Sequence, residues 1–559
     1  MFKTQMDAAL GKIPCDLILR NVTFLDVFSN EWRTNDVSIH NGKIVGLDPG
    51  LKAIRDIDCK GKFLVPGFID AHVHVESSLV VPRNFEKSVL PLGTTGAVCD
   101  PHELTNVLGS KALKYFLDEA DQLSLDLRVM LSSCVPATHL ETNGGGHVLA
   151  KDLIPFKSHR KALGLAEVMN VPGVLFGDEV VHEKLHAFQD RPIDGHCPLL
   201  TGKELSAYAL TGISSCHESS QLEEAREKLT KGIAVWIREG SVAKDLEALT
   251  PLLDLGSSLS IGFCTDDRNP LDIAHEGHLN YLIREAIRRG VDPKVAYRSA
   301  SYSVAAHYGI HKGYDRVGAI APGFRADLVL LDDAKTVAIH SVLKSGRFVN
   351  EIDFGIGKIS ASRTESTIFA DPVTETDFEG IQGRVHVIEV ESGKIITGRS
   401  VKDSTHESVA RLSVVERHGQ KSKPANAYVS GFGNAFQGAI ASSVGHDSHN
   451  LIVVGKQTRD MQVAVNAVRE MAGGFCVVKN GQVLSSLPLP FGGLMSTAEP
   501  KEIELKLVDL RKASREIGCE LAEPFLQLAF LSLPVIPSLK LTDKGLVDVD
   551  LFKVIDVRA

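Results

Sequence analysis

Short apolar runs alternate with helical patterns through the central part of the chain. Eight apolar or β-branched runs lie near residues 67–72, 94–99, 128–134, 162–168, 192–197, 212–217, 232–237 and 259–265. Segments with helical spacing separate them, as at 201–210, 220–231 and 271–289. Eight strands alternating with helices over about 200 residues are typical of a (β/α)8 barrel. The sequence therefore predicts an α/β protein with a TIM-type barrel at residues 67–317.

The residues before the barrel have the pattern of short strands. Asn41-Gly42 separates two such runs, and this pair favours a type I′ turn because both central residues need a positive φ. A β-rich piece of this size cannot bury a core of its own. Similar runs recur at 323–331 and 342–349. We therefore expect a small β-sandwich built from both flanks of the barrel, residues 1–66 and 318–365.

The pattern changes again after about residue 365. A strand is expected at 451–455, and a helix over 459–472 ends at Gly473-Gly474, a plausible C-cap. Asn480-Gly481 follows as a second hairpin signal. These features predict a further C-terminal α/β domain at residues 366–559.

Composition narrows the class of protein. The 559 residues carry a formal net charge of −9 without a basic stripe, which argues against nucleic acid as the main partner. Nine scattered cysteines without a C-x-x-C pair favour a reducing compartment. No secretory leader pattern or long apolar span occurs. We therefore expect a cytoplasmic protein without a membrane partner. A closed homo-oligomer, with a dimer as the default, is expected on general grounds.

Candidate metal ligands recur where the predicted strands end. His72 and His74 are alternate residues of one strand, so their side chains leave the same face. Barrels place their chemistry at the C-terminal ends of the strands. A lone histidine there is often structural, and a lone aspartate often caps a helix, but their recurrence favours a metal site. The other strand-end candidates are Asp100, His102, Glu167, His196, His217, Asp266 and Asp267.

The type of ligand suggests two ions. Five residues would supply ordinary metal ligands: His72, His74, His196, His217 and Asp266. Two divalent ions also need a shared anion that offsets their mutual repulsion. Glu167, at the end of the fourth strand, is well placed to bridge them.

These motifs resemble a known family. The stretch 66–74, followed by Glu167, His196, His217 and Asp266, resembles the amidohydrolase superfamily. The match is closer to the bacterial adenine deaminases, and it includes a late block at 446–450. The motifs that carry it are 72–78, 100–103, 166–170, 265–268 and 446–450.

The resemblance implies a binuclear enzyme that uses manganese or iron(II). On the family pattern, His72 and His74 hold one ion, His196 and His217 hold the other, and Glu167 bridges them. Many relatives bridge their metals with a carboxylated lysine, and Glu167 in its place weakens a hydantoinase-like reading.

The implied reaction is hydrolytic deamination of adenine to hypoxanthine and ammonia. Asp266 would bind metal and accept a proton from the water, and His217 or Glu218 would help to protonate the ring or the departing ammonia. An amidohydrolase acting on a cyclic amide or on another nucleobase is the alternative within enzymes. A non-catalytic scaffold is a third possibility, but all six candidate ligands are present.

Several residues are candidates for contact with the substrate. Asp100 and His102 either line the pocket, with a possible metal contact, or belong to a turn at Asp100-Pro101. Glu141 begins a Gly-rich loop that is more typical of a lid or substrate loop than of a phosphate cradle. Asp267 follows a candidate ligand. His446 and His449 either form a structural hydrogen-bonding knot or reach across the barrel mouth and shape the purine pocket.

Overall fold

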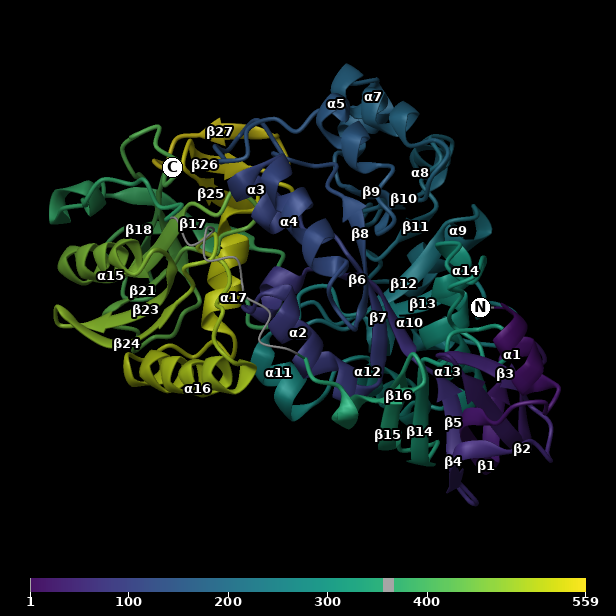
Figure 1. Ribbon diagram of the computed structural model, residues 1–559. Helices are drawn as coiled ribbons and strands as arrows, with labels where there is room; N and C mark the ends of the chain where they lie inside the picture. The colour runs from purple at the N-terminus through teal and green to yellow at the C-terminus, as the bar shows by residue number, and fades with distance from the viewer. Residues whose placement is uncertain (1, 355–365) are drawn as a thin grey trace.

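The computed structural model describes residues 2–354 and 366–559. A central barrel lies between a mixed sheet near the N-terminus and a sheet-rich C-terminal region (Figure 1). Within the described ranges, no helix has the length and apolarity needed to cross a membrane.

The barrel consists of eight parallel strands joined in chain order, as the sequence predicts. They are β6 (Phe68–Val73), β7 (Thr94–Cys99), β8 (Asp126–Leu131), β9 (Ala162–Val168), β10 (Ile193–Gly195), β11 (Ser215–Cys216), β12 (Ala234–Arg238) and β13 (Ile261–Cys264). Helices that follow these strands include α3 (His102–Leu108), α4 (Ser110–Ala120), α6 (Val171–Phe176), α8 (Gly202–Ala209), α9 (Leu222–Thr230), α11 (Pro270–His275) and α12 (Leu279–Arg288). A single bridge between Val73 and Asp266 joins the first strand to the end of the last. The candidate ligands therefore lie around one rim.

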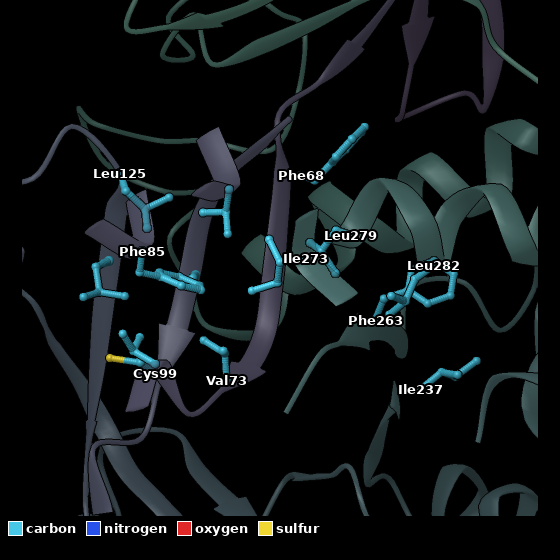
Figure 2. Close-up of a cluster of buried hydrophobic side chains, with 14 of the residues drawn as sticks. Phe68, Val73, Phe85, Cys99, Leu125, Ile237, Phe263, Ile273, Leu279 and Leu282 are labelled. Carbon is cyan, nitrogen blue, oxygen red and sulfur yellow. The ribbon is translucent and has the colours of Figure 1, made fainter. Parts of the chain in front are cut away.

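The barrel strands are apolar because both of their faces are covered. Every residue of β6, β7, β9 and β13 is buried, as is usual for parallel strands. Phe68 and Phe263 from the strands pack in one cluster with Phe85 from α2 (Pro82–Val89) and Leu282 from α12 (Figure 2). This packed layer fixes the strands whose ends carry the site.

Both flanks of the barrel contribute to one sheet. Its strands are β1 (Cys15–Asp26), β2 (Glu31–His40), β3 (Lys43–Gly46), β4 (Ala53–Asp58), β5 (Phe63–Pro66), β14 (Leu328–Asp333), β15 (Ala338–Lys344) and β16 (Arg347–Phe348). β5 pairs with β1 on one side and with β14 on the other. Asn41 and Gly42 have φ values of 49° and 71°, which confirms the predicted turn. The limits of the three predicted domains stay a prediction, and residues 355–365 lie outside the described residues.

The C-terminal region contains a second large sheet. Its order is β18 (Gly398–Asp403), β17 (Arg384–Glu389), β20 (Ala425–Ser430), β19 (Ala410–Val415), β22 (Leu451–Gly455), β21 (Ala439–Ser442), β23 (Gly474–Lys479) and β24 (Gln482–Pro488). The predicted helix is α15 (Thr458–Glu470), and the hairpin at Asn480-Gly481 is confirmed. β25 (Leu539–Thr542), β26 (Gly545–Asp548) and β27 (Lys553–Ile555) form a small third sheet.

Two helices of the C-terminal region lie toward the barrel. α16 (Pro500–Glu516) contacts α2 and α11 of the barrel domain. α17 (Pro524–Ala529) packs on β21 and β22 and lies between the C-terminal sheet and the barrel (Figure 1). The C-terminal region therefore stands beside the barrel rather than apart from it.

Candidate active site

The end of β6 brings two imidazoles together, with ring planes 84° apart and ring centroids 4.7 Å apart. The Nε2 atoms of His72 and His74 are 3.1 Å apart, and both residues are buried. The Nδ1 atom of His74 faces the carbonyl oxygen of Asp100 at 3.0 Å. A proton on Nδ1 leaves the Nε2 lone pair free as a ligand. Two such nitrogens in contact fit a shared cation, so this pair meets the requirement for a metal site.

Glu167 lies between two groups of histidines. Its Oε1 atom is 3.4 Å from His74 Nε2 and 3.7 Å from His72 Nε2. Its Oε2 atom is 2.7 Å from His196 Nδ1 and 3.3 Å from His217 Nε2. Oε1 also lies 3.2 Å from His102 Nδ1. The two carboxylate oxygens therefore face different sets of imidazoles, which is the arrangement that a bridge between two ions requires.

The backbone around Glu167 has a local cause in the sequence. β9 ends at Val168, and α6 begins after Asn170, whose side-chain oxygen accepts a hydrogen bond from Gly173 N at 2.9 Å. An asparagine in this N-cap position satisfies a helix N–H and fixes the entry of the chain into the helix. The loop after Glu167 is thus held by its own sequence.

Asp266 closes the ring of ligands. Its φ is 52°, a left-handed conformation that costs about 1–2 kcal/mol for a residue other than glycine. Hydrogen bonds hold this backbone, because Asp266 N donates to His72 O and His74 N donates to Asp266 O. The Oδ1 atom of Asp266 consequently lies 3.1 Å from His74 Nε2.

Arg238, at the end of β12, joins two acidic groups of the site. Its guanidinium donates to Asp266 Oδ2 at 3.1 Å and makes an ion pair with Glu218. Burial acts to raise the pKa of Glu218, but the charges of Arg238, His196 and His217 together outweigh it and lower that pKa. Burial likewise opposes ionisation of Glu167, yet His217 and its other histidine partners hold its pKa well below the ordinary value. Both carboxylates are ionised in this environment.

The predicted ligands converge, whereas the predicted substrate contacts fall into two groups. His102, Asp267 and His446 line the central cavity together with the ligand residues. Asp100 lies behind His102, at 3.0 Å from its Nδ1 atom, and is not part of the lining. Glu141 and His449 are also buried outside the lining. His449 Nε2 contacts Glu103 Oε2, and burial lowers the pKa of His449 to about 4, so this imidazole is neutral. Glu141 lies near Asp447.

Sequence reasoning missed three residues of the site. Arg238 directly follows the predicted strand at 232–237, and this position at a strand end was the available signal. Glu103 contacts His102 Nε2 at 3.3 Å and His446 Nδ1 at 2.6 Å, so it ties the barrel to the C-terminal region. Asp447 lines the cavity, but nothing in a local pattern of one chain predicts which residue of the 446–450 motif reaches the barrel.

The fold and the ligand set define a metal-dependent hydrolase built on a barrel. A model of the amidohydrolase family matches residues 63–349. A second model, for the adenine deaminase C-terminal domain, matches residues 386–553. The chain belongs to the amidohydrolase family.

Curated relatives narrow the identification. An adenine deaminase from Gluconobacter oxydans (strain 621H) is 50% identical over 554 residues, which cover 96% of this chain and 97% of that protein. One from Brucella suis biovar 1 (strain 1330) is 46% identical over 565 residues, covering 99% of this chain and 96% of that protein. The crystal structure of enamidase matches 59% of this chain and 95% of its own, with 17% identity and a TM-score of 0.44. Within its family, the chain belongs with the adenine deaminases.

Proposed function

We propose that the chain hydrolyses adenine to hypoxanthine and ammonia with the help of two divalent ions. His72, His74 and Asp266 would hold one ion, His196 and His217 the other, and Glu167 would bridge them. The single observation that carries this proposal is Glu167, one of whose oxygens faces His72, His74 and His102 while the other faces His196 and His217. When bound, the ions lower the pKa of water and so supply hydroxide at neutral pH.

The residues of the chain move the protons. Addition of water at C6 of adenine and loss of ammonia require both protons of the water to move, one to a ring nitrogen and one to the departing amino group. Asp266 accepts the first, because its Oδ1 atom belongs to the ligand cluster while Arg238 holds Oδ2. Glu218 lies 3.9 Å from His217 and lines the same cavity, so this pair is placed to return protons. Such transfers contribute about 10²–10⁴-fold to a rate.

The type of ligand atom also favours particular metals. Imidazole nitrogens with carboxylates suit iron and manganese, and we assign manganese or iron(II) to the two positions. The substrate is the free purine base. Nine cysteines without a disulfide among the described residues support a reducing compartment, and we assign the cytoplasm. The assembly as a homo-oligomer, with a dimer as the default, stays a prediction.

Release of ammonia tests the proposal. Purified chain is loaded with manganese or iron(II) and incubated separately with adenine, adenosine, cytosine and hydantoin. We expect ammonia from adenine, little from the ribose-bearing nucleoside, and no hydrolysis of hydantoin. Turnover of hydantoin without ammonia from adenine would favour the cyclic amide alternative, and the absence of every reaction would contradict both.

A further inference from the structure

The cavity above the ligands has a second wall that the barrel does not supply. Four of its residues are apolar, and two are polar. They come from the C-terminal region: Ile395, His446, Asp447, Phe530, Leu533 and Ile536. The reacting carbon must lie at the ligand cluster on the barrel rim, so this wall faces the remainder of the substrate.

Specific contacts hold the wall against the barrel. His446 is paired with Glu103 of α3, and its ring stacks on Phe530 with centroids 4.6 Å apart. Phe530, Leu533 and Ile536 form a small apolar cluster and are at most 7% exposed. The wall is therefore fixed relative to the ligands, because buried contacts join it to the barrel helix next to His102.

Asp447 is an unusual member of this wall. It is 2% exposed, and its Oδ2 atom has no hydrogen-bond partner among the described residues. Its Oδ1 atom lies 3.9 Å from His102 Nε2 and 3.8 Å from His446 Nδ1, beyond hydrogen-bond distance. A buried carboxylate oxygen without a donor is costly, which indicates that a donor arrives with a ligand.

The chemistry of the base identifies that donor. In adenine, C6 and the N–H of the five-membered ring lie at opposite ends of the fused rings. With C6 at the ligand cluster, this N–H is directed across the cavity toward the C-terminal wall. A carboxylate is a strong acceptor for an N–H donor. We propose that Asp447 is a specificity-determining residue that accepts a hydrogen bond from this N–H, an inference that rests on the function proposed above.

Substrates that carry a substituent on N9, the nitrogen of this N–H group, would then be disfavoured for two reasons. The substitution removes the donor, which leaves the Asp447 carboxylate buried and unpaired. It also directs the substituent at Ile395, Phe530, Leu533 and Ile536, which offer only apolar side chains to a sugar hydroxyl. A site built around a hydrogen bond rejects analogues that lack the donor far better than an apolar pocket does.

The test compares adenine with 9-methyladenine, which lacks the donor and adds one methyl group. The manganese-loaded chain is compared with its Asp447→Ala and Asp447→Asn variants by kcat/KM from ammonia release. We expect the unchanged chain to prefer adenine by at least about 100-fold. Asp447→Ala should lower kcat/KM for adenine by about 10–100-fold and change that for 9-methyladenine by less than about threefold. Asp447→Asn keeps an acceptor oxygen, so its kcat/KM for adenine should fall less than that of Asp447→Ala.

Asp460→Asn provides a matched control. Asp460 is a buried carboxylate of α15 that accepts from Gly481 N and does not line the cavity, so the preference should stay unchanged. Metal content and melting temperature establish that each variant is folded. Equal losses for both substrates in Asp447→Ala would overturn the inference while leaving the proposed function intact. No ammonia from adenine with the unchanged chain would overturn both.

Discussion

Replacement of Glu167 by glutamine tests the bridge directly. Glutamine has the same shape but only one acceptor oxygen, and its amide nitrogen cannot bind a metal ion. Oε1 is 3.4 Å from His74 Nε2 and Oε2 is 3.3 Å from His217 Nε2, so either orientation of the amide removes a ligand from one position. The substitution also removes the negative charge that offsets the repulsion between the two ions.

The expected loss of metal affinity in Glu167→Gln can be estimated from the role of a metal ligand. Loss of a residue that merely orients a ligand costs about 10–100-fold in metal affinity. Loss of a bridging ligand must cost at least as much, which is about 1.4–2.7 kcal/mol. We expect Glu167→Gln to fall from two ions toward one per chain, with a decrease in kcat of at least about 100-fold.

Metal analysis and ammonia release on the same preparation provide the measurement. Glu86→Gln is the matched control, because Glu86 is a buried glutamate of α2 whose Oε2 accepts from Leu125 N, a bond that glutamine can keep. Circular dichroism checks the fold of both variants. If Glu167→Gln kept two ions and nearly full activity, Glu167 would not be the bridge.

Three further predictions concern metal, packing and pH. Removal of metal with a chelator should abolish ammonia release and lower the melting temperature, and manganese should restore both. A ligand present at a concentration of 100 times its Kd stabilises the folded chain by about 2.7 kcal/mol. Unchanged activity after removal of the metal would contradict this prediction. Phe68→Ala should destabilise the fully buried core by about 3–5 kcal/mol in urea unfolding, whereas Phe176→Ala, at an 88% exposed position, should change it by less than about 0.5 kcal/mol. Burial lowers the pKa of Lys540 from 10.5 to about 7, so between these values the unfolded chain binds a proton that the folded chain does not. Stability should therefore rise with pH in this window by up to about 1.4 kcal/mol per unit, and Lys540→Met should remove that rise; an identical pH profile in the variant would refute it.

Periodicity predicted the barrel and its rim because these depend on local patterns. Apolar runs of strand length, separated by helices, allow few other topologies. His72 and His74 could be assigned to one face because a strand alternates its side chains. Asn41-Gly42 and Asn480-Gly481 could be assigned to turns because few residues adopt positive φ easily.

Other parts of the site depend on contacts between distant segments, which one sequence does not encode locally. The positive φ of Asp266 results from backbone hydrogen bonds to β6, nearly 200 positions earlier in the chain. The pairing of Glu103 with His446 likewise requires the C-terminal region to dock beside α3. For the same reason, Asp447 could be recognised as part of the cavity only in three dimensions.

The location of metal in crystals of the manganese-loaded chain tests the central claim most directly. Anomalous diffraction should show two peaks about 3.5–4 Å apart, one beside His72 and His74 and one beside His196 and His217, with Glu167 between them. A single peak, or peaks away from these imidazoles, would contradict a binuclear site and the chemistry assigned to it.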